Sequence, residues 1–252
     1  MLKIGDIVTR KKYNHDILFR IDKIVDNIAY LSGVDLRLCA DAEINDLVIS
    51  NSNRKKEQYN IIKNLDINRF FYIPGSVLHL DSDSNYLEKC LEYYKREKVK
   101  CNGYIFKESD YPHVIKKLIE KHKPNVIVIT GHDSFNIKNN KYKNSAYFEE
   151  TVKISNSISK QIIISGACQS NFEGLIKSGA TFASSPARIN IHALDPAIIA
   201  CYVAKTDRCE KINLEEVLSK TKYGDEGIGG IISYGVMITG APRKGKNWIL
   251  IK

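Results

Sequence analysis

The chain has 252 residues and a mass of 28.6 kDa, a length typical of one or two domains. Hydrophobic residues make up 43% and charged residues 27%, which supports a buried core and excludes a wholly disordered chain. No apolar run approaches the roughly 18 residues of a membrane span, and the first residues do not form a secretory signal, so we expect a soluble cytoplasmic protein.

The net charge is +9, from 38 Lys and Arg against 29 Asp and Glu. The excess is spread thinly along the chain, and its clusters at 54–56, 138–143 and 243–246 lie in segments that we predict to be loops. A nucleic-acid site concentrates positive charge on one face, so the pattern argues against one, while attraction to anionic partners fits the charge.

Six cysteines occur without a Cys-x-x-Cys pair and without the His/Cys spacing of a zinc site, so we expect reduced thiols and neither a metal nor another cofactor. Most should be small core residues. They are Cys39, Cys90, Cys101, Cys168, Cys201 and Cys209.

The first 50 residues predict a compact β unit. Short apolar runs at 7–9, 17–21, 28–31 and 36–39 are separated by Asn, Asp and Gly turn signals. This spacing suits a small barrel of the SH3 type at 1–50. Residues 51–70 are polar and basic without a clean period, which indicates a linker before a second domain at 71–252.

From residue 71 the chain alternates between apolar strands and amphipathic helices. Strands are expected at 77–80, 102–106, 126–129, 162–164 and 181–183, helices at 84–97, 110–121, 146–155, 171–178, 191–204 and 214–219, and apolar segments at 231–234 and 248–251 finish the chain. Near-continuous apolar strands that alternate with helices predict an α/β fold, a mostly parallel sheet covered on both faces in an αβα sandwich.

Ligands of such sheets bind at the carboxyl ends of the strands. His132 follows the strand at 126–129 and Cys168 follows the strand at 162–164, each behind a glycine. A single helix connects these strands, so they should be parallel neighbours whose ends meet at one edge. A thiol nucleophile beside an imidazole base needs this arrangement.

Two other readings stay open on the residues alone. His192 could replace His132 as the base, which would give a Cys-dependent amidohydrolase with Cys before His. A non-enzymatic binding protein would use the N-terminal barrel as an adaptor and its basic surface to dock on nucleic acid or another anionic partner. His79 lies inside a strand and should be packed rather than reactive, while His15, His113 and His122 should lie on the surface.

An apolar strand, His, crossover, apolar strand and Gly-Ala-Cys-Gln resemble the caspase-like cysteine peptidases. More closely, PGSVLHLDSDSNYLEKCL, VIVITGHDSF and SGACQSNFEGLIKSGATFASSPARINIHALDP resemble the YabG family of sporulation-specific proteases of endospore-forming bacteria. The resemblance implies a cysteine endopeptidase of the mother-cell cytoplasm and spore coat. It would cleave spore coat and cortex-associated proteins after Arg or Lys, with His132 and Cys168 as its dyad.

One departure concerns the oxyanion donors. Caspase-like peptidases carry Gly directly after the catalytic His, whereas here Gly131 precedes His132 and Asp133 follows it. The N–H groups of Cys168 and Asp133 are therefore the expected donors to an oxyanion. Asp133 has two alternative roles, to orient His132 or to cap the next turn.

A preference for basic residues requires a carboxylate in the pocket. Asp81 and Asp83 follow the first strand of the second domain at the same edge, and Asp83 has the better position to cap the next helix. Ser184 and Ser185 follow the strand at 181–183 and could bind the backbone of an extended substrate, or form a plain turn before Pro186.

The linker should also be a substrate, because it contains Arg54, Lys55, Lys56 and Arg69 and flexible polar segments are where proteolysis concentrates. We expect purified wild-type protein to be cut between residues 51 and 70, and Cys168→Ala to stay intact, when new N-termini are sequenced. An intact wild-type chain that still digests other proteins after Arg would contradict this prediction.

Overall fold

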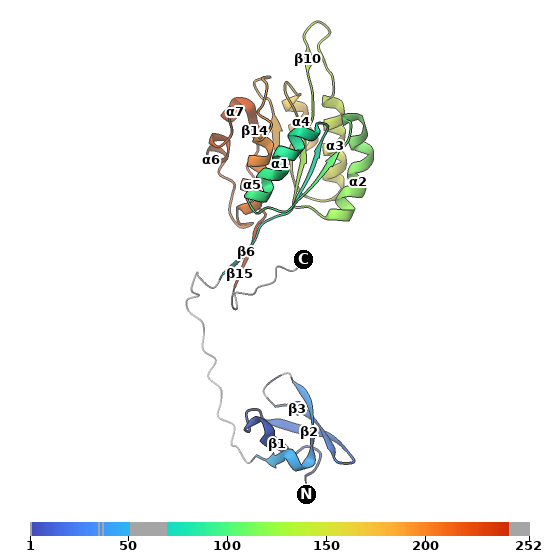
Figure 1. The fold of residues 1–252 in the computed structure, drawn as a ribbon, viewed down its shortest axis with the longest axis vertical. Helices are drawn as coiled ribbons and strands as arrows, with labels where there is room; N and C mark the ends of the chain where they lie inside the picture. The colour runs from blue at the N-terminus through green and yellow to red at the C-terminus, as the bar shows by residue number, and fades with distance from the viewer. Residues whose placement is uncertain (1, 35, 37, 51–69, 242–252) are drawn as a thin grey trace. The chain divides into compact units, whose positions relative to one another are not determined.

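The structure is a computed structural model and describes residues 2–34, 36, 38–50 and 70–241 (Figure 1). Cα packing divides the chain into two compact units, residues 1–63 and 64–252. The predicted linker at 51–70, except Phe70, and the apolar segment at 248–251 lie outside the described residues.

The N-terminal unit is an antiparallel sheet of five strands in the order β4-β3-β2-β1-β5. Alternate residues of these strands, including Val8, Phe19 and Ile21, point inward and form its core. The strands are β1 (Ile7–Arg10), β2 (Phe19–Val25), β3 (Ile28–Gly33), β4 (Cys39–Glu43) and β5 (Leu47–Ile49). The first three predicted strands are confirmed. The fourth was placed too early, and β5 was missed because it is only three residues long.

The second unit contains a sheet of six strands in the order β14-β13-β12-β9-β7-β8. Five strands are parallel, and β14 pairs antiparallel with β13 at the edge. The strands are β7 (Val77–Asp81), β8 (Cys101–Ile105), β9 (Val126–Ile129), β12 (Ile162–Ser165), β13 (Phe182–Ser184) and β14 (Ile228–Gly230). The mostly parallel α/β sheet is thus confirmed.

The apolar segment at 231–234 is not a strand of this sheet, because the edge strand lies earlier, at β14. Its Gly229 and Gly230 pack against the rings of Phe172 and Phe182, and a Cβ on Gly230 would come within 2.4 Å of Phe182. Ile231 and Ile232 are instead 50% and 70% exposed. Close packing therefore selects glycines for this strand, and an apolar pattern does not detect it.

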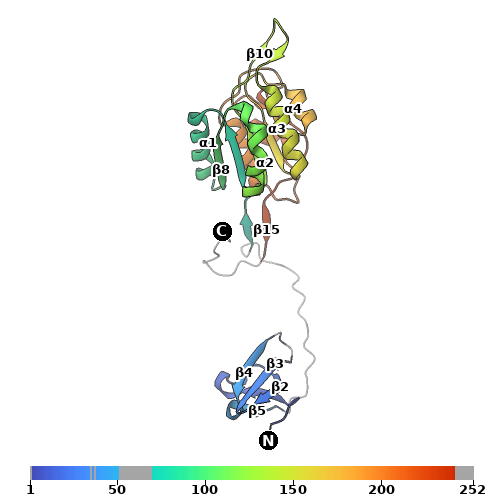
Figure 2. The ribbon, with the colours of Figure 1, turned by 90° about the vertical axis from the view of Figure 1, so that its right-hand side faces the viewer.

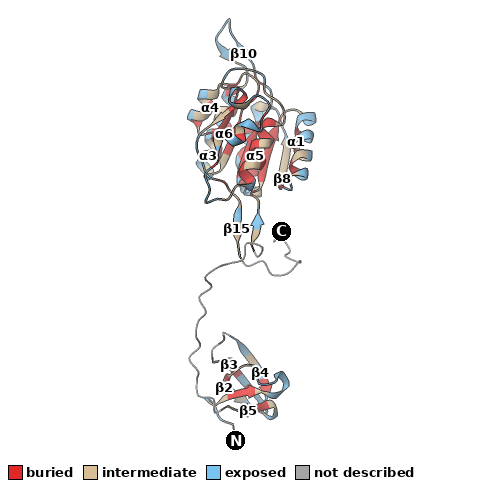
Figure 3. Cartoon of the chain, turned by 90° about the vertical axis from the view of Figure 1, so that its left-hand side faces the viewer, coloured by how far each residue is buried: buried red, intermediate tan, exposed pale blue. Residues whose placement is uncertain are grey.

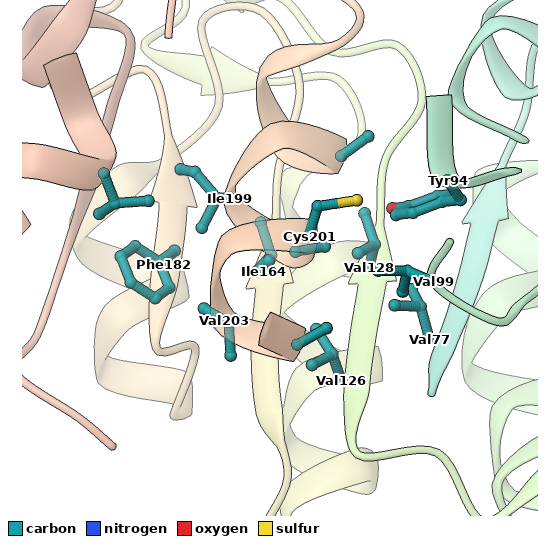
Figure 4. Close-up of a cluster of buried hydrophobic side chains, with 14 of the residues drawn as sticks. Val77, Tyr94, Val99, Val126, Val128, Ile164, Phe182, Ile199, Cys201 and Val203 are labelled. Atoms are coloured by element: carbon teal, nitrogen blue, oxygen red, sulfur yellow. The ribbon is translucent and has the colours of Figure 1, made fainter. Parts of the chain in front are cut away.

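Helices cover both faces of the sheet (Figures 1 and 2). α1 and α5 pack on one face against residues such as Val128 and Ile164, as Figure 4 shows, and α2, α3 and α4 pack on the other. Burial is concentrated in the strands and in α5 (Figure 3). The helices are α1 (Ser84–Arg96), α2 (Tyr111–His122), α3 (Ser145–Ile158), α4 (Phe172–Ser178), α5 (Asp195–Lys205), α6 (Leu214–Ser219) and α7 (Gly224–Gly227).

Five of the predicted helices are confirmed within a few residues at their ends. The helix predicted at 191–204 is α5, and it begins at Asp195 rather than at residue 191. Pro196 occupies its first turn, where a missing backbone N–H costs nothing. Two short strand pairs were not predicted. They are β6 (Phe71–Ile73) with β15 (Ile238–Gly240), and β10 (Phe135–Asn136) with β11 (Lys141–Tyr142).

Strand register brings three chain segments to one edge of this sheet. Leu80 of β7 pairs with Ile129 of β9, and Ile129 pairs with Ser165 of β12, so these strands end level with one another. The parallel pairing of β9 and β12 confirms the predicted neighbours. The chain passes from β7 to β8 on one side and then to β9 on the other, which opens a crevice between β7 and β9.

Candidate active site

A cavity of about 460 Å³ opens at this edge. The segments that follow β7, β9 and β12 form one side of it, and the segment before α5 forms the other. His132 and Cys168 both line it, together with Asp81, Tyr86, Lys89, Thr130, Gly131, Gly166, Ile191, His192, Ala193, Leu194, Pro196 and Tyr223. The structure therefore brings the predicted thiol and imidazole to one cavity.

Cys168 differs from the buried cysteines of this fold. Burial raises the pKa of Cys90 and of Cys201 to about 12, which leaves both as inert core thiols. Cys168 is partly exposed to the cavity, and its Sγ accepts a hydrogen bond from the N–H of Ile191 at 3.4 Å. This bond fixes the sulfur at the cavity wall. The six cysteines are free, but Cys39 and Cys209 are exposed rather than in the core.

His132 is held by two carboxylates. Its Nε2 lies 3.5 Å from Asp83 Oδ2, and its backbone N–H donates to Glu108 Oε1 at 2.8 Å. Asp83 also caps α1 by accepting the N–H groups of Asn85 and Tyr86, and these bonds together with His132 lower the pKa of Asp83. Asp83 is thus an ionised partner for the ring.

This contact favours one tautomer of His132. A neutral ring with its hydrogen on Nε2, facing Asp83, would leave Nδ1 unprotonated. His192 has the opposite arrangement, because its Nδ1 accepts the N–H of Leu194 at 3.3 Å. Its other nitrogen then carries the hydrogen in the neutral ring. His192 Nδ1 also lies 3.9 Å from Asp195 Oδ1, so each of the two imidazoles has a carboxylate near one nitrogen, but no described residue bonds Nδ1 of His132.

Asp133 does not contact the imidazole of His132. Its buried carboxylate accepts the N–H of Asn144 at 2.8 Å, the hydroxyl of Ser170 at 3.1 Å and the hydroxyl of Ser145. It thereby ties the segment after β9 to the start of α3 and to the turn that carries Cys168. Its side chain holds these loops together, so its backbone N–H is the group left to bind a substrate.

The backbone N–H groups of Cys168 and Asp133 donate no hydrogen bond within the described part of the chain. Neighbouring donors are occupied, since the N–H of Ala167 bonds to Ser170 and that of Gly166 to Ile129. Unpartnered N–H groups beside a nucleophile are available to an oxyanion.

Asp81 lies at the cavity at the end of a buried hydrogen-bond chain. The Thr130 hydroxyl donates to Asp81 Oδ2 at 2.6 Å, so His79 Nε2, at 2.8 Å from the same hydroxyl, must donate to it. Tyr94 then donates to His79 Nδ1 at 3.1 Å. Burial lowers the pKa of His79 to about 3, which keeps the ring neutral and confirms that it is packed.

Among the described residues no Lys or Arg forms an ion pair with the carboxylate of Asp81, although Lys89 lines the same cavity. The side chain of Asp81 is 4% exposed, and burial raises its pKa, helped by the nearby charge of Asp83 and opposed by its hydrogen bonds. A buried carboxylate of this kind is stabilised by any cation that enters the cavity.

Ser184 and Ser185 are buried and do not line this cavity. Ser185 accepts the N–H of Gln169 at 3.1 Å and donates to the carbonyl of Ile189 at 2.7 Å, so it braces the turn after Cys168. Ser184 packs behind Gly166, whose φ of +116° and close neighbours leave no space for a side chain.

Several supporting residues were not predicted. Glu108, in the short helix after β8, accepts from Ser82 at 2.6 Å as well as from His132. Burial alone would raise its pKa, but these hydrogen bonds lower it below its ordinary value. Glu108 could have been predicted from its position after a strand that ends at the same edge of the sheet. The same signal was available for Thr130.

Within residues 2–34, 36, 38–50 and 70–241, no group of three His, Cys, Asp or Glu side chains could hold a metal ion. In the same part of the chain no helix is long and apolar enough to cross a membrane.

The chain matches the YabG peptidase U57 family over residues 3–68 and 51–242. It is 38% identical over 285 aligned positions to the sporulation-specific protease YabG of Bacillus subtilis (strain 168), and the alignment covers 96% of this chain and 98% of that protein. The chain belongs to the YabG peptidase family. No solved structure matches it.

Membership of the YabG peptidase family makes the protein a protease, and therefore a hydrolase, associated with sporulation. The resemblance seen in the sequence is confirmed, and the non-enzymatic reading and the amidohydrolase reading are set aside. The cavity at the edge of the sheet is the candidate place for peptide hydrolysis in this YabG-family chain.

Asp83 has two functions that one substitution can separate. Asp83→Asn keeps an N-cap but removes the charge facing His132, so we expect unchanged thermal stability and a kcat reduced roughly tenfold. Asp83→Ala removes the cap as well and should also lose about 1 kcal/mol of unfolding free energy. Equal kcat for wild type and Asp83→Asn would show that the contact with His132 has no catalytic role.

Proposed function

We propose that the protein is a cysteine endopeptidase that cleaves protein substrates after Arg or Lys, with Cys168 as nucleophile and His132 as base. The observation that supports this proposal is that Cys168 and His132 line one cavity, while the backbone N–H groups of Cys168 and Asp133 have no partner in the described part of the chain. Family membership supports the proteolytic activity, and the side chains support the thiol mechanism.

The reaction follows from these atoms. His132 Nδ1 takes the proton of the Cys168 thiol, and the sulfur attacks the scissile carbonyl carbon. The negative charge that develops on the carbonyl oxygen is bound by the N–H groups of Cys168 and Asp133. His132 then gives its proton to the leaving amine, and water activated by the same ring hydrolyses the thioester. Asp83 keeps the ring oriented and stabilises its charged form.

Asp81 is the proposed partner of the basic side chain. A substrate Arg or Lys that enters the cavity would meet a buried carboxylate that forms no ion pair with a described Lys or Arg. Tyr86, Tyr223 and Leu194 offer apolar surface along which the stem of such a side chain can lie. Asp83 is committed to its helix and to His132, which favours Asp81. The burial of Ser184 and Ser185 favours support of the loops over substrate binding.

The finer description of the fold is also a proposal. A caspase-like domain at 71–252 is supported by helices on both faces of the sheet and by a His and then a Cys after neighbouring strands. An SH3-like barrel at 1–50 is supported by five short antiparallel strands in which β1 pairs with both β2 and β5. The boundaries at 50 and 70 remain predictions.

The proposed substrates are proteins of the spore coat and cortex machinery, and the proposed sites of action are the mother-cell cytoplasm and the coat. The relative from Bacillus subtilis supports this placement through its description as sporulation-specific. No membrane or nucleic-acid partner is part of the proposal.

The dyad is tested by replacing each cavity histidine. We expect His132→Ala and Cys168→Ala to lose cleavage of an arginine peptide, and His132→Ala to react slowly with a thiol-directed inhibitor, since the sulfur has lost its base. His192→Ala should retain most activity. Mass spectrometry of a coat-type protein digested by each variant checks this. An inactive His192→Ala beside an active His132→Ala would reverse the assignment.

The pocket is tested by Asp81→Asn. An unpaired substrate cation in a partly desolvated site costs about 3 kcal/mol, so kcat/KM for arginine peptides should fall roughly 150-fold while inhibitor alkylation persists. Because burial raises the pKa of Asp81 above its ordinary 3.8, falling pH should neutralise it early, and KM for arginine peptides should rise in mildly acidic buffer. Equal turnover of Arg, Leu and Asp peptides would exclude this pocket.

A further inference from the structure

The hairpin of β10 and β11 is a basic arm beside the cavity. It stands out from the carboxyl edge of the sheet, beyond the helices of this unit, in both views (Figures 1 and 2). Lys138, Lys141 and Lys143 are exposed on it, and residues 134–148 contain no Asp or Glu. Within the described part of the chain none of the three lysines forms an ion pair.

The base of this hairpin is attached to the turn that carries the nucleophile. The N–H of Phe135 donates to Gln169 Oε1 at 3.2 Å, and Gln169 directly follows Cys168. The guanidinium of Arg188 lies 5.0 Å from the centre of the Phe135 ring, on the face of the hairpin base. Phe135 also packs on Tyr142, with ring centres 4.7 Å apart, which holds the two strands together.

We propose that this hairpin, together with Arg188, is a docking arm for an acidic segment of the protein substrate next to the scissile bond. The proposal rests on the proposed function and adds a second determinant to it. Strands and extended peptides both rise about 3.3 Å per residue, so an arm about four residues long extends roughly 13 Å from the nucleophile turn. The acidic residues should therefore lie about three to six positions from the cleaved Arg.

Charge complementarity favours an acidic peptide over a nucleic acid. The arm presents four unpaired cations, whereas the cavity edge beneath it carries the carboxylates of Asp81, Asp83 and Glu108. A polyanion that followed the arm into the cavity would meet those negative charges. A peptide with acidic residues and one Arg matches both regions at once, and mixed complementarity of this kind selects partners.

The test compares 20-residue peptides that share one Arg and carry either Glu or Gln three to six positions from it, on each side in turn. Binding is measured by fluorescence anisotropy on full-length Cys168→Ala protein, and kcat/KM on active protein. The arm is reversed by Lys138→Glu, Lys141→Glu and Lys143→Glu together. The matched control reverses Lys116, Lys117 and Lys153, which are exposed on α2 and α3.

We expect one Glu peptide to bind and to be cleaved roughly fivefold to tenfold better than its Gln counterpart, since exposed pairs are individually weak but several act together. Reversal of the arm and 0.5 M salt should each remove this advantage, and the control should keep it. A four-residue arginine peptide, too short to reach the arm, should be cleaved equally by wild type, by the arm variant and by the control variant.

Equal binding of Glu and Gln peptides by Cys168→Ala protein would overturn the docking arm even if the short peptide is cleaved as expected. Loss of the short peptide's cleavage in the arm variant alone would also overturn it, by placing the hairpin in the catalytic machinery. If wild-type protein binds duplex DNA and the arm variant does not, and neither distinguishes the Glu peptide from the Gln peptide, the arm would be assigned to nucleic acid. A wild-type enzyme that leaves the short peptide uncut contradicts the proposed function separately.

Discussion

The level ends of β7, β9 and β12 are the constraint on which this site depends. Parallel hydrogen bonding fixes Leu80, Ile129 and Ser165 in one row, so the next few residues of each strand emerge together. Asp81, His132 and Cys168 lie far apart along the chain and have no other reason to meet. A slip of one residue in any of these pairings would turn that strand's side chains to the opposite face and move its active-site residue out of the cavity.

Polar groups are buried beneath the cavity, beside the same row of strand ends, and their burial costs stability. Asp81 is kept in a nearly closed site where burial disfavours its charge, and the hydrogen bonds from the Thr130 hydroxyl and from the backbone of Asp83 and Ser82 oppose that effect. Burial also keeps the His79 ring neutral, and in this form it links Tyr94 to Thr130 in the hydrogen-bond chain. A core built for stability alone would place apolar side chains here, so a buried carboxylate at this position fits a site that binds a cation.

Sequence patterns predicted the elements that repeat a physical signal and missed those that do not. Apolar runs located β7, β9 and β12, and the end-of-strand rule then found His132, Cys168 and Asp81. Glycines chosen for close packing hid β14, and the hairpin after β9 is too short to show a period. The carboxylates beside His132 were visible as residues, but which one faces the ring depends on how α1 leaves the sheet, and spacing does not encode that.

The N-terminus of α1 joins the fold to the chemistry. Asp83 ends the turn after β7 by capping the helix, and the same carboxylate lies 3.5 Å from the imidazole that follows β9. When the neutral ring directs its hydrogen to Asp83, its other nitrogen is left basic. Two histidines share one cavity, and the hydrogen bond at Nδ1 distinguishes them, because the N–H of Leu194 occupies that atom in His192 and no described residue bonds it in His132.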